Sequence, residues 1–353
     1  MCDHQGIDRN APARASGLSR RSLLRNAGGL TLAIGVGGGF CRAAHAADTT
    51  LKSTHGGGFC NLNLFLAHAE QLAADDGLNL QFVNTPTFAD QVTFLGTGQV
   101  DVGLTPYTSF LALYDAGAPI RIVAGGGIEG CAVVAQPGID SPESMKGKVL
   151  GTQQMDTLEV LPYDYLKKRG VSFANITVRY VGGQAEGVEM FRAGALDMYA
   201  TIEPYASAAL ADVPGATLLT DGIDLYGPGY TDCVLAASTD VIENNPEALK
   251  ALIKGMMEAQ AMAESNPQEV LDKVVGTYYK TSMDAAQAAM SKQPAVVDAR
   301  DQTEFILERV ASVAEMGYIK EKPGREAIDW SLLEEVIAEN PDLYASLKRK
   351  SAA

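Results

Sequence analysis

The sequence predicts an α/β protein built from two similar lobes, and three observations support this. A phrase occurs twice about a hundred residues apart, as FLGTGQVDVGLTPY at 94–107 and FRAGALDMYATIEPY at 191–205. Apolar runs of strand length alternate with amphipathic segments between residues 50 and 235. From Thr239 onward the periodicity is helical almost throughout. The chain is therefore expected to combine two sheet-containing lobes with a helical C-terminal region.

The repeated phrase predicts where a ligand would bind. Each copy ends a helix with Gly-x-(Val/Leu)-Asp, at 98–101 and 194–197, and stops at Pro-Tyr after a short apolar strand. Glycine permits the left-handed turn that closes a helix, and proline suits the first turn of the next one. Ligands of open α/β sheets bind beyond the carboxyl ends of the strands. The two lobes should therefore present strand ends to a shared crevice, with chance recurrence of common α/β elements as the alternative.

The element order follows from the apolar runs. Strands are expected at 50–54, 78–84 and 100–104 in the first lobe, and at 148–152, 176–181, 197–202 and 216–220 in the second. The runs at 120–124, 131–135 and 231–238 are expected to cross between the lobes. Asn-Pro pairs at 245, 266 and 340 are typical helix starts. Lobe 1 is thus assigned to 47–134 and 235–353, and lobe 2 to 135–234.

The N-terminal segment has the pattern of an export signal. Residues 19–24 read SRRSLL, a twin-arginine motif, and a glycine-rich, mildly apolar stretch follows up to Phe40. Ala44-His45-Ala46 supplies a small-x-small cleavage site, so residues 1–46 are expected to be a twin-arginine signal peptide that directs the chain to the periplasm. The apolar stretch is too short for a membrane span of roughly 20 residues. Cys41 raises a lipoprotein alternative, which the bulky Phe40 before it disfavours.

Composition restricts the partners. The leader holds six of the 28 basic and two of the 43 acidic residues, which leaves 22 basic against 41 acidic residues, a net charge of −19. Such a surface disfavours nucleic acid and anionic membranes. About 307 residues remain after the leader, which is more than one modest hydrophobic core usually contains. This length agrees with two lobes. Cys60, Cys131 and Cys233 are odd in number and far apart in sequence, so a disulfide framework is not expected, although one bridge stays open.

Four segments resemble a known family. They are the first Gly-x-Val-Asp strand, the second such strand ending at Glu203-Pro204, SPESMKG at 141–147, and NPEALKALIKGMMEAQAM at 245–262. Together they resemble the substrate-binding proteins of ABC importers, in the branch for nitrate, sulfonates, taurine and thiamine-pyrimidine precursors. The resemblance covers essentially all of the chain after the leader. It implies a two-lobed type II periplasmic-binding fold with a hinge, capture of a small molecule, and delivery by a monomer to an ABC permease and ATPase.

Candidate ligand-binding residues lie where strands should end at the crevice. From the first-lobe loops these are His55, Gly57, Gly58, Phe59, Asn61, Thr105, Tyr107, Thr108 and Glu129. From the second lobe and the return crossover they are Gln154, Asp156, Thr157, Gly183, Glu203, Tyr205, Tyr230 and Asp232. The competing roles are helix capping for Thr105, Tyr107 and Thr108, an ion pair within the lobe for Glu203, and hinge structure for Tyr230 and Asp232.

The residue types in these loops favour one ligand class. The loops contain no Lys or Arg, and Arg121 and Arg192 lie outside them. Carboxylates accept hydrogen bonds from amino groups, and aromatic faces stack on flat rings or cations. A neutral or cationic organic solute containing nitrogen or sulfur, heteroaromatic ones included, is therefore favoured over a simple anion.

Catalysis, cofactors and metals are not expected. Cys60 near His55 invites a nucleophilic pair, but no third orienting group is evident. Only His55 and His68 remain after the leader, and no cluster has metal-ligand spacing. Two rival functions stay open. One is an enzyme on the same fold, like the pyrimidine-precursor synthases, whose cysteine-rich motif is absent here. The other is a ligand-sensing module for a membrane receptor.

Overall fold

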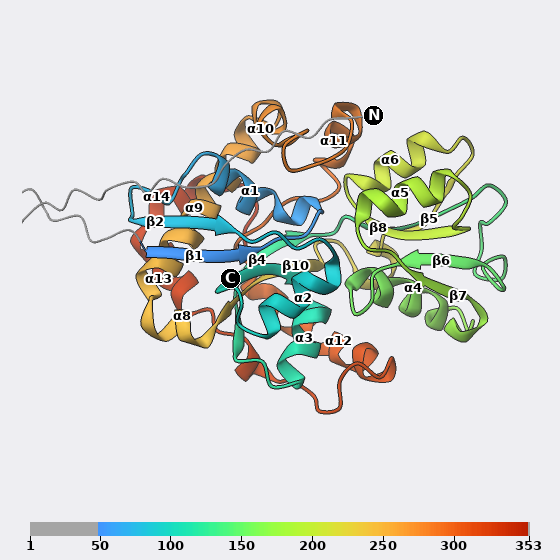
Figure 1. Cartoon of the computed structure of the whole chain (residues 1–353), viewed down its shortest axis with the longest axis horizontal. Helices are drawn as coiled ribbons and strands as arrows, with labels where there is room; N and C mark the ends of the chain where they lie inside the picture. The colour runs from blue at the N-terminus through green and yellow to red at the C-terminus, as the bar shows by residue number, and fades with distance from the viewer. Residues whose placement is uncertain (1–48, 352–353) are drawn as a thin grey trace, which may run out of the picture. The chain divides into compact units, whose positions relative to one another are not determined.

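The computed structural model describes residues 49–351 and contains two five-stranded sheets (Figure 1). Sheet 1 has the order β2-β1-β3-β10-β4 and consists of β1 (Thr49–Thr54), β2 (Leu78–Phe82), β3 (Val102–Pro106), β4 (Ile120–Ile128) and β10 (Thr231–Ser238). Sheet 2 has the order β7-β6-β8-β5-β9 and consists of β5 (Cys131–Ala135), β6 (Val149–Thr152), β7 (Thr177–Tyr180), β8 (Met198–Ile202) and β9 (Thr217–Thr220).

The two sheets have the same topology. In sheet 1, β1 pairs in parallel with β2 and β3, and β10 runs antiparallel to β3 and β4. In sheet 2, β6 pairs in parallel with β7 and β8, and β5 runs antiparallel to β8 and β9. Strands β10 and β5 thus hold equivalent positions, although they are far apart in the chain. The α/β class and the two-lobed similarity predicted from the sequence are confirmed.

The repeated phrase forms equivalent structures in the two sheets. Gly98 and Gly194 each have a φ of 70°, the left-handed conformation that closes α2 and α5. Asp101 precedes β3, and its carboxylate accepts from the backbone N–H of Lys52 at 2.7 Å. Asp197 precedes β8 and accepts from the N–H of Val149 at 2.8 Å. The aspartate of the phrase therefore ties each third strand to the start or middle of its parallel neighbour.

Helices cover both faces of the sheets. Those near sheet 1 are α1 (Leu62–Ala69), α2 (Phe88–Gly96) and α3 (Tyr107–Asp115), and those near sheet 2 are α4 (Thr157–Lys168), α5 (Gln184–Arg192), α6 (Tyr205–Asp212) and α7 (Ile223–Tyr226). The C-terminal region adds α8 (Thr239–Asn244), α9 (Pro246–Ser265), α10 (Pro267–Val274), α11 (Met283–Ala289), α12 (Thr303–Glu315), α13 (Ser331–Glu339) and α14 (Pro341–Ser346). No helix among residues 49–351 is long and apolar enough to cross a membrane.

Packing explains the continuous apolar runs in the sequence. All five residues of β3, β5 and β8 are buried, because helices lie on both faces of these strands. In sheet 2, Val133 and Leu150 pack with Leu158 and Leu166 of α4, whereas Val134 and Tyr199 pack with Phe191 of α5 on the other face. In sheet 1, α9 supplies Leu249, Leu252 and Met256 to the core around Leu51 and Leu235.

Two chain segments connect the sheets side by side. Glu129 and Gly130 join β4 to β5 and have φ angles of 58° and 81°. The backbone N–H of Glu129 donates to the carbonyl of Tyr230 at 2.8 Å, just before β10 returns to sheet 1. The Glu129 carboxylate accepts from the N–H of Gly229 at 2.6 Å. The two crossings are therefore bonded to each other, as expected at a hinge. The exact lobe boundaries stay a prediction, and the export signal at 1–46 lies outside the described residues.

Candidate functional site

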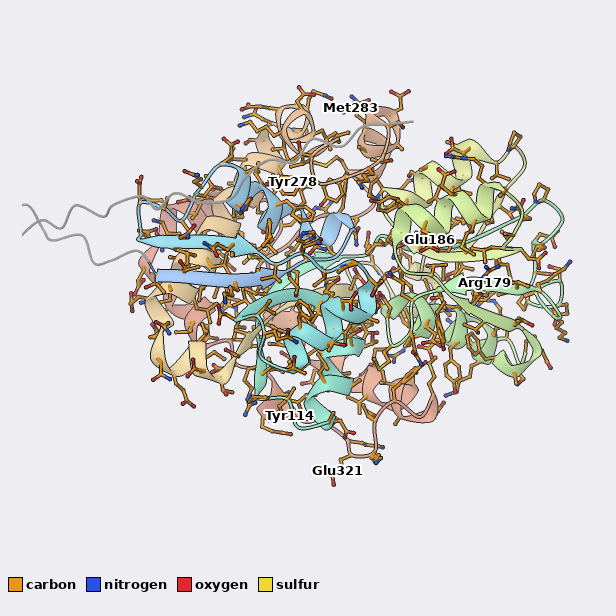
Figure 2. All side chains as sticks on the ribbon, in the orientation of Figure 1. Tyr114, Arg179, Glu186, Tyr278, Met283 and Glu321 are labelled. Atoms are coloured by element: carbon orange, nitrogen blue, oxygen red, sulfur yellow. The ribbon has the colours of Figure 1, made fainter. Side chains whose placement is uncertain are left out.

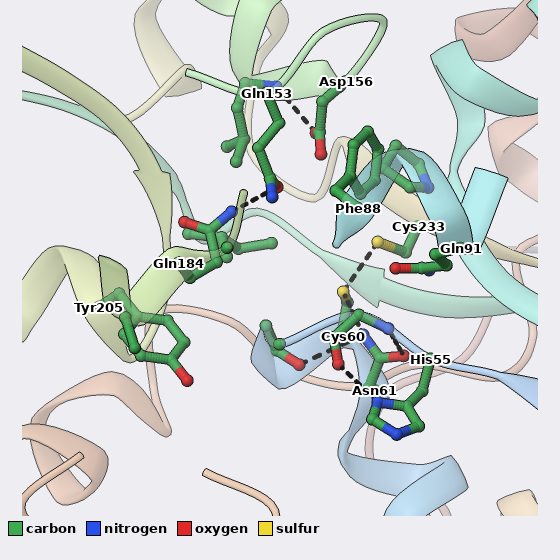
Figure 3. Close-up of a pocket in the computed structure, with 18 of the residues that line it drawn as sticks. His55, Cys60, Asn61, Phe88, Gln91, Gln153, Asp156, Gln184, Tyr205 and Cys233 are labelled. Atoms are coloured by element: carbon green, nitrogen blue, oxygen red, sulfur yellow. Dashed lines mark hydrogen bonds between the residues drawn. The ribbon is translucent and has the colours of Figure 1, made fainter. Parts of the chain in front are cut away.

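A cavity of about 340 Å³ lies between loops of sheet 1 and loops of sheet 2 (Figure 3). This volume is typical of a small-molecule site. From the side of sheet 1 it is lined by His55–Gly58, Cys60, Asn61, Thr85–Phe88, Gln91, Leu104, Pro106, Asp232 and Cys233. From the side of sheet 2 it is lined by Gln153, Asp156, Leu158, Gly182–Glu186, Ile202 and Tyr205, and the C-terminal region adds Tyr278 and Lys280. Glu186 on α5 and Tyr278 are both labelled in Figure 2.

The loop after β1 is folded by its own polar groups. Asn61 accepts from the backbone N–H of Gly56 at 3.0 Å and donates to the sulfur of Cys60 at 3.3 Å. His55 packs edge-on against Phe65 and Phe82, with ring centroids 4.8 Å away in each case. Its Nδ1 lies 3.1 Å from the Gly56 carbonyl, and burial lowers the pKa of its imidazole. His55 is therefore a neutral group at pH 7, held by aromatic packing at the edge of the cavity.

Side-chain amides form a network on the opposite wall. Gln184, the first residue of α5, donates from Nε2 to Oε1 of Gln153 at 2.7 Å, as Figure 3 shows. Its own Oε1 accepts from the hydroxyls of Tyr199 at 2.7 Å and Thr201 at 2.8 Å. Across the cavity, Gln91 donates to the carbonyl of Leu104 at 3.0 Å. These partners hold amide groups in fixed orientations, which suits hydrogen-bonding to a polar ring or amide.

Two buried carboxyl groups in the cavity lining contact the same hydroxyl group. Oδ1 of Asp156 accepts from the backbone N–H of Leu158 at 3.0 Å and caps α4. The Thr157 hydroxyl lies 2.9 Å from the same oxygen and also contacts Oδ1 of Asp232. Burial, followed by the charge of Asp232, raises the pKa of Asp156 to about 8. Burial also raises the pKa of Asp232. Asp156 is thus mostly protonated at pH 7 in the ligand-free protein.

The charged groups that line the cavity are mainly acidic. Asp156, Asp232 and Glu186 contribute carboxyl groups, and Lys280 is the one lysine or arginine in the lining. The sequence did not predict this lysine, because it comes from the C-terminal region and not from a loop of either sheet. Arg192 instead pairs with Glu189 and Asp212 on the surface, and Arg121 lies over the ring of Tyr114. Among residues 49–351, no arginine lines the cavity.

Direct contacts join the two sides of the cavity. The backbone N–H of Phe59 donates to the Glu203 carbonyl at 2.9 Å, and that of Phe88 donates to the Gly182 carbonyl at 3.1 Å. Gly58 lies so close to Ile202 that an added Cβ would be 2.8 Å from Cδ1 of the isoleucine. The structure therefore has its two sides in contact around the cavity, and glycine at position 58 permits that approach.

Eight of the residues nominated from the sequence line this cavity: His55, Gly57, Gly58, Asn61, Asp156, Gly183, Tyr205 and Asp232. The other nine lie outside its lining: Phe59, Thr105, Tyr107, Thr108, Glu129, Gln154, Thr157, Glu203 and Tyr230.

Several residues outside the lining have clear structural roles. Phe59 is fully buried against Tyr279. Tyr107, the first residue of α3, is buried beside Phe305. Thr105 is buried in β3. The Thr108 hydroxyl donates to the Met155 carbonyl at 2.8 Å and joins α3 to the loop before α4. The hydroxyl of Tyr230 donates to the Asp221 carbonyl at 2.7 Å, next to the hinge contact with Glu129.

Glu203 lies outside the lining of this cavity. Its carboxylate accepts from the backbone N–H and the hydroxyl of Ser207, each at 3.0 Å, and lies 3.4 Å from Nζ of Lys292. It therefore bonds to the first turn of α6 and pairs with a lysine of the C-terminal region, whereas the alternative considered from the sequence was an ion pair within its own lobe. Gln154 is exposed, and its neighbour Gln153 lines the cavity instead.

Sequence reasoning missed the loop after β2 and the start of α5. Thr85–Phe88, Gln91 and Gln184 line the cavity, and Tyr278 and Lys280 reach it from a region expected to be a helical appendage. One available signal was position: Thr85 follows β2 and Gln184 follows β7, each at the carboxyl end of a parallel strand. Nothing in the local sequence around Tyr278 indicates contact with the loops that follow β1 and β2.

Comparison with known proteins identifies the family. A family profile described as NMT1/THI5 like matches residues 62–270, more than half of the chain. The chain belongs to the NMT1/THI5-like family. A protein of Brucella abortus that carries the provisional description of a binding protein is 27% identical over 193 residues. That match spans 54% of this chain and 58% of the relative, less than two thirds of the relative's length.

Solved structures show the fold of this NMT1/THI5-like chain. The alkanesulfonate-binding protein SsuA from Xanthomonas axonopodis pv. citri, bound to MOPS, matches with a TM-score of 0.70 at 18% identity, over 81% of this chain and 99% of that chain. The periplasmic nitrate-binding protein NrtA from Synechocystis PCC 6803 matches with a TM-score of 0.70 at 14% identity, over 86% and 91%. The resemblance inferred from the sequence is confirmed in family and in fold.

Proposed function

We propose that this NMT1/THI5-like protein is a periplasmic solute-binding protein that captures a small organic solute and delivers it to an ABC importer. The solute is a neutral or cationic compound containing nitrogen or sulfur, with heteroaromatic rings included, and not a simple anion. The observation that carries this proposal is the Asp156 carboxyl group, which lines the cavity beside Asp232 with no arginine in the lining.

The charge of the cavity supports the ligand class. A nitrate or sulfonate placed beside Asp156, Glu186 and Asp232 would have Lys280 as its one cationic partner in the lining. An ammonium or amidinium group would instead favour ionisation of Asp156 and pair with the resulting carboxylate in a buried site, where charge pairing is strong. The amides of Gln91, Gln153 and Gln184 and the ring of Tyr205 suit the remaining polar and flat surfaces of a nitrogen heterocycle.

The hinge supports binding with closure. Contacts such as Phe59 to Glu203 and Phe88 to Gly182 join the two sides, and the crossings at Glu129 and Tyr230 are short and paired. A solute that touches both walls would favour this closed arrangement over an open one. We propose that the closed form is what an ABC permease recognises.

Cys60 supports binding more than catalysis. Burial raises the pKa of its thiol to about 11, and His55 bonds to the Gly56 carbonyl rather than to the sulfur. A nucleophilic cysteine needs a thiolate at neutral pH, with an adjacent base or cation to lower its pKa. The enzyme alternative therefore has no activated nucleophile at this position.

A matched ligand panel tests the proposal. The chain without its leader would be screened by thermal shift and calorimetry against an aminopyrimidine, a trimethylammonium compound, an alkanesulfonate and nitrate. Binding at a hundredfold excess over the dissociation constant adds about 2.7 kcal/mol of stability. We expect a shift with one of the first two compounds, and its loss in Asp156→Asn. Tight binding of nitrate or the alkanesulfonate with no response to the first two would overturn the ligand class.

A further inference from the structure

Three potential metal-binding side chains converge in the cavity wall. Cys60 belongs to the short 3-10 helix Phe59–Asn61 after β1, whereas Asp232 and Cys233 belong to β10, more than 170 residues later. Sequence spacing therefore conceals the cluster. Its formation depends on Gly127 of β4, where an added Cβ would be 2.7 Å from Cα and Cβ of Cys60. The glycine lets the Cys60 turn lie directly against β4, the edge strand of sheet 1 next to β10.

The three side chains are close together and buried. Sγ of Cys60 lies 2.8 Å from Sγ of Cys233, and Sγ of Cys233 lies 3.0 Å from Oδ2 of Asp232. One donor atom from each residue lies within 4.8 Å of the others. Cys60, Asp232 and Cys233 are each at most 4% exposed, yet all three contribute to the lining of the cavity. Figure 3 shows the two sulfur atoms facing each other.

We propose that Cys60, Asp232 and Cys233 form a binding site for a thiophilic divalent cation of the Zn²⁺ class. Two thiolates and one carboxylate are a ligand set that borderline and soft cations prefer. No lysine, arginine or histidine forms an ion pair or a hydrogen bond with any of the three side chains among residues 49–351. A divalent cation would leave a net charge of −1 on the cluster, whereas a monovalent one would leave −2 in a buried site, so the divalent ion is favoured.

Neighbouring groups are arranged to orient these ligands. Asn61 donates an N–H to the sulfur of Cys60 at 3.3 Å, which stabilises a thiolate. Gln293 donates to Oδ2 of Asp232 at 3.3 Å, and the Thr157 hydroxyl contacts Oδ1. Hydrogen bonds of this kind fix the orientation of metal ligands and tune their basicity. Cys131 contacts Oδ1 of Asp232 at 3.2 Å and lies outside the ligand set.

A disulfide between Cys60 and Cys233 is the competing chemistry. Two sulfurs bound at about 2.3 Å to one tetrahedral Zn²⁺ lie about 3.8 Å apart, so cation entry would separate the present pair by about 1 Å. A disulfide would draw the pair together to about 2.05 Å. A disulfide would also remove the S–H of Cys233, which now donates a hydrogen bond to Asp232. A cation would instead put a positive charge beside this carboxylate in place of the proton. The buried carboxylate therefore favours the metal.

The site has room for a further ligand. Three protein ligands leave one position of a tetrahedral Zn²⁺ for water or for a donor atom of a solute. Because the three residues line the same cavity as Asp156, the cation and a solute would occupy neighbouring parts of one space. The proposal does not depend on the solute class, since the metal alone can be tested.

Cobalt is the probe for the test. Chain 47–353 would be purified under reducing conditions, freed of metal with a chelator, and titrated with Co²⁺. We expect one equivalent to bind with a sulfur-to-cobalt charge-transfer absorption, and Zn²⁺ to displace it. Cys60→Ser, Cys233→Ser and Asp232→Asn should each weaken binding at least about 100-fold, because each removes a ligand. Cys131→Ser is the matched control and should retain the absorption.

Two outcomes would overturn the metal site. One is Co²⁺ binding without the charge-transfer absorption in the wild-type protein, or binding that persists in both cysteine variants. The other is an intact mass 2 Da below the reduced chain, with a Cys60–Cys233 crosslink in the peptide map and no metal uptake after reduction. Circular dichroism of every variant separates loss of metal ligands from loss of the fold, and the wild-type titration stands even if a variant fails to fold.

Discussion

Asp156 and Asp232 share a single hydroxyl group, that of Thr157. A hydroxyl has one proton, so it can donate to only one of the two carboxyl groups at a time. Both contacts are hydrogen bonds when the other carboxyl group is itself protonated and donates to the Thr157 oxygen. This arrangement agrees with the pKa of about 8 for Asp156, which burial and the charge of Asp232 produce. One proton held by this pair makes both stability and ligand binding sensitive to pH.

Stability should fall with rising pH because of Asp156. The folded protein holds this proton more tightly than the unfolded chain, whose aspartate has a pKa near 3.8. The contribution is therefore fully present below pH 4 and is lost as the pH rises through about 8. Asp156→Asn keeps the cap of α4 and does not titrate. We expect the free energy of unfolding of the wild type, relative to this variant, to decline between pH 4 and pH 8 in urea titrations. A constant difference would contradict the raised pKa.

Solute affinity should depend on pH, and the direction of the change should show whether the solute is a cation or a neutral acceptor. A cation needs ionised Asp156, so its affinity should rise about 50-fold from pH 6 to pH 8 for a single group of pKa about 8. A neutral acceptor that uses the Asp156 proton should bind more weakly above pH 8. Calorimetry of metal-free protein in buffers of different ionisation enthalpy measures both the affinity and the protons released. Affinity that is independent of pH would exclude contact with this carboxyl group.

Glu203 should matter for stability and not for solute binding. Its carboxylate is buried and accepts two hydrogen bonds from Ser207. Glu203→Gln removes the charge and one acceptor, which should cost about 1–3 kcal/mol. The melting temperature should therefore fall while the solute dissociation constant changes less than about twofold. Lys292→Met, which removes the partner cation, is the control and should have a smaller effect because the lysine is half exposed. Lost affinity at an unchanged melting temperature would reverse this assignment.

Closure should depend on the absence of a side chain at Gly58. A Cβ there would be 2.8 Å from Cδ1 and 2.9 Å from Cγ2 of Ile202 on the opposite wall. Gly58→Ala should therefore hold the two sides apart and weaken solute binding about tenfold or more. Gly255→Ala in α9 is the control, because it lies outside the cavity lining and its added Cβ would meet its neighbours at an ordinary 3.5 Å. Small-angle scattering with and without solute reports the closure, and equal compaction in the two variants would argue against this contact.

Export should depend on the arginine pair of the leader. Arg20 and Arg21 form the twin-arginine motif, and lysine preserves their charge while changing the recognised side chain. Arg20→Lys with Arg21→Lys should leave the full-length precursor in the cytoplasm, measured by fractionation and immunoblotting. Single Arg21→Lys is the milder comparison. Processed protein in the periplasm at wild-type levels would contradict this route.

The elements were predictable because local patterns determine them. The strand expected at 50–54 is β1 at Thr49–Thr54, and that expected at 148–152 is β6 at Val149–Thr152. The first is a threonine-rich segment that ends at the His55–Gly58 loop, and the second follows Gly147. The repeated Gly-x-(Val/Leu)-Asp also predicted the positions of the two equivalent strands. Its glycine adopts the left-handed turn, and its aspartate accepts a hydrogen bond from the backbone of the neighbouring strand.

The site was predictable only in part. The direction in which a side chain points depends on the local backbone, and its contacts depend on segments that are distant in the sequence. The sequence nominated Gln154, whereas its neighbour Gln153 lines the cavity and Gln154 is exposed. The sequence also placed Glu203 at the end of a strand. In the structure, its carboxylate accepts a hydrogen bond from the backbone N–H of Ser207 in the next helical turn.

The sequence by itself determined the family, the two similar lobes and the acidic residues near the crevice. These properties depend on periodicity, on glycine turns and on composition, all of which are local. Only the tertiary structure brought Cys60 to Cys233 and Asp156 to Asp232, because β10 returns from the second sheet and inserts between β3 and β4 of the first. The physical reason is that burial and charge coupling depend on which segments are neighbours in space, and no local pattern encodes that for residues so far apart.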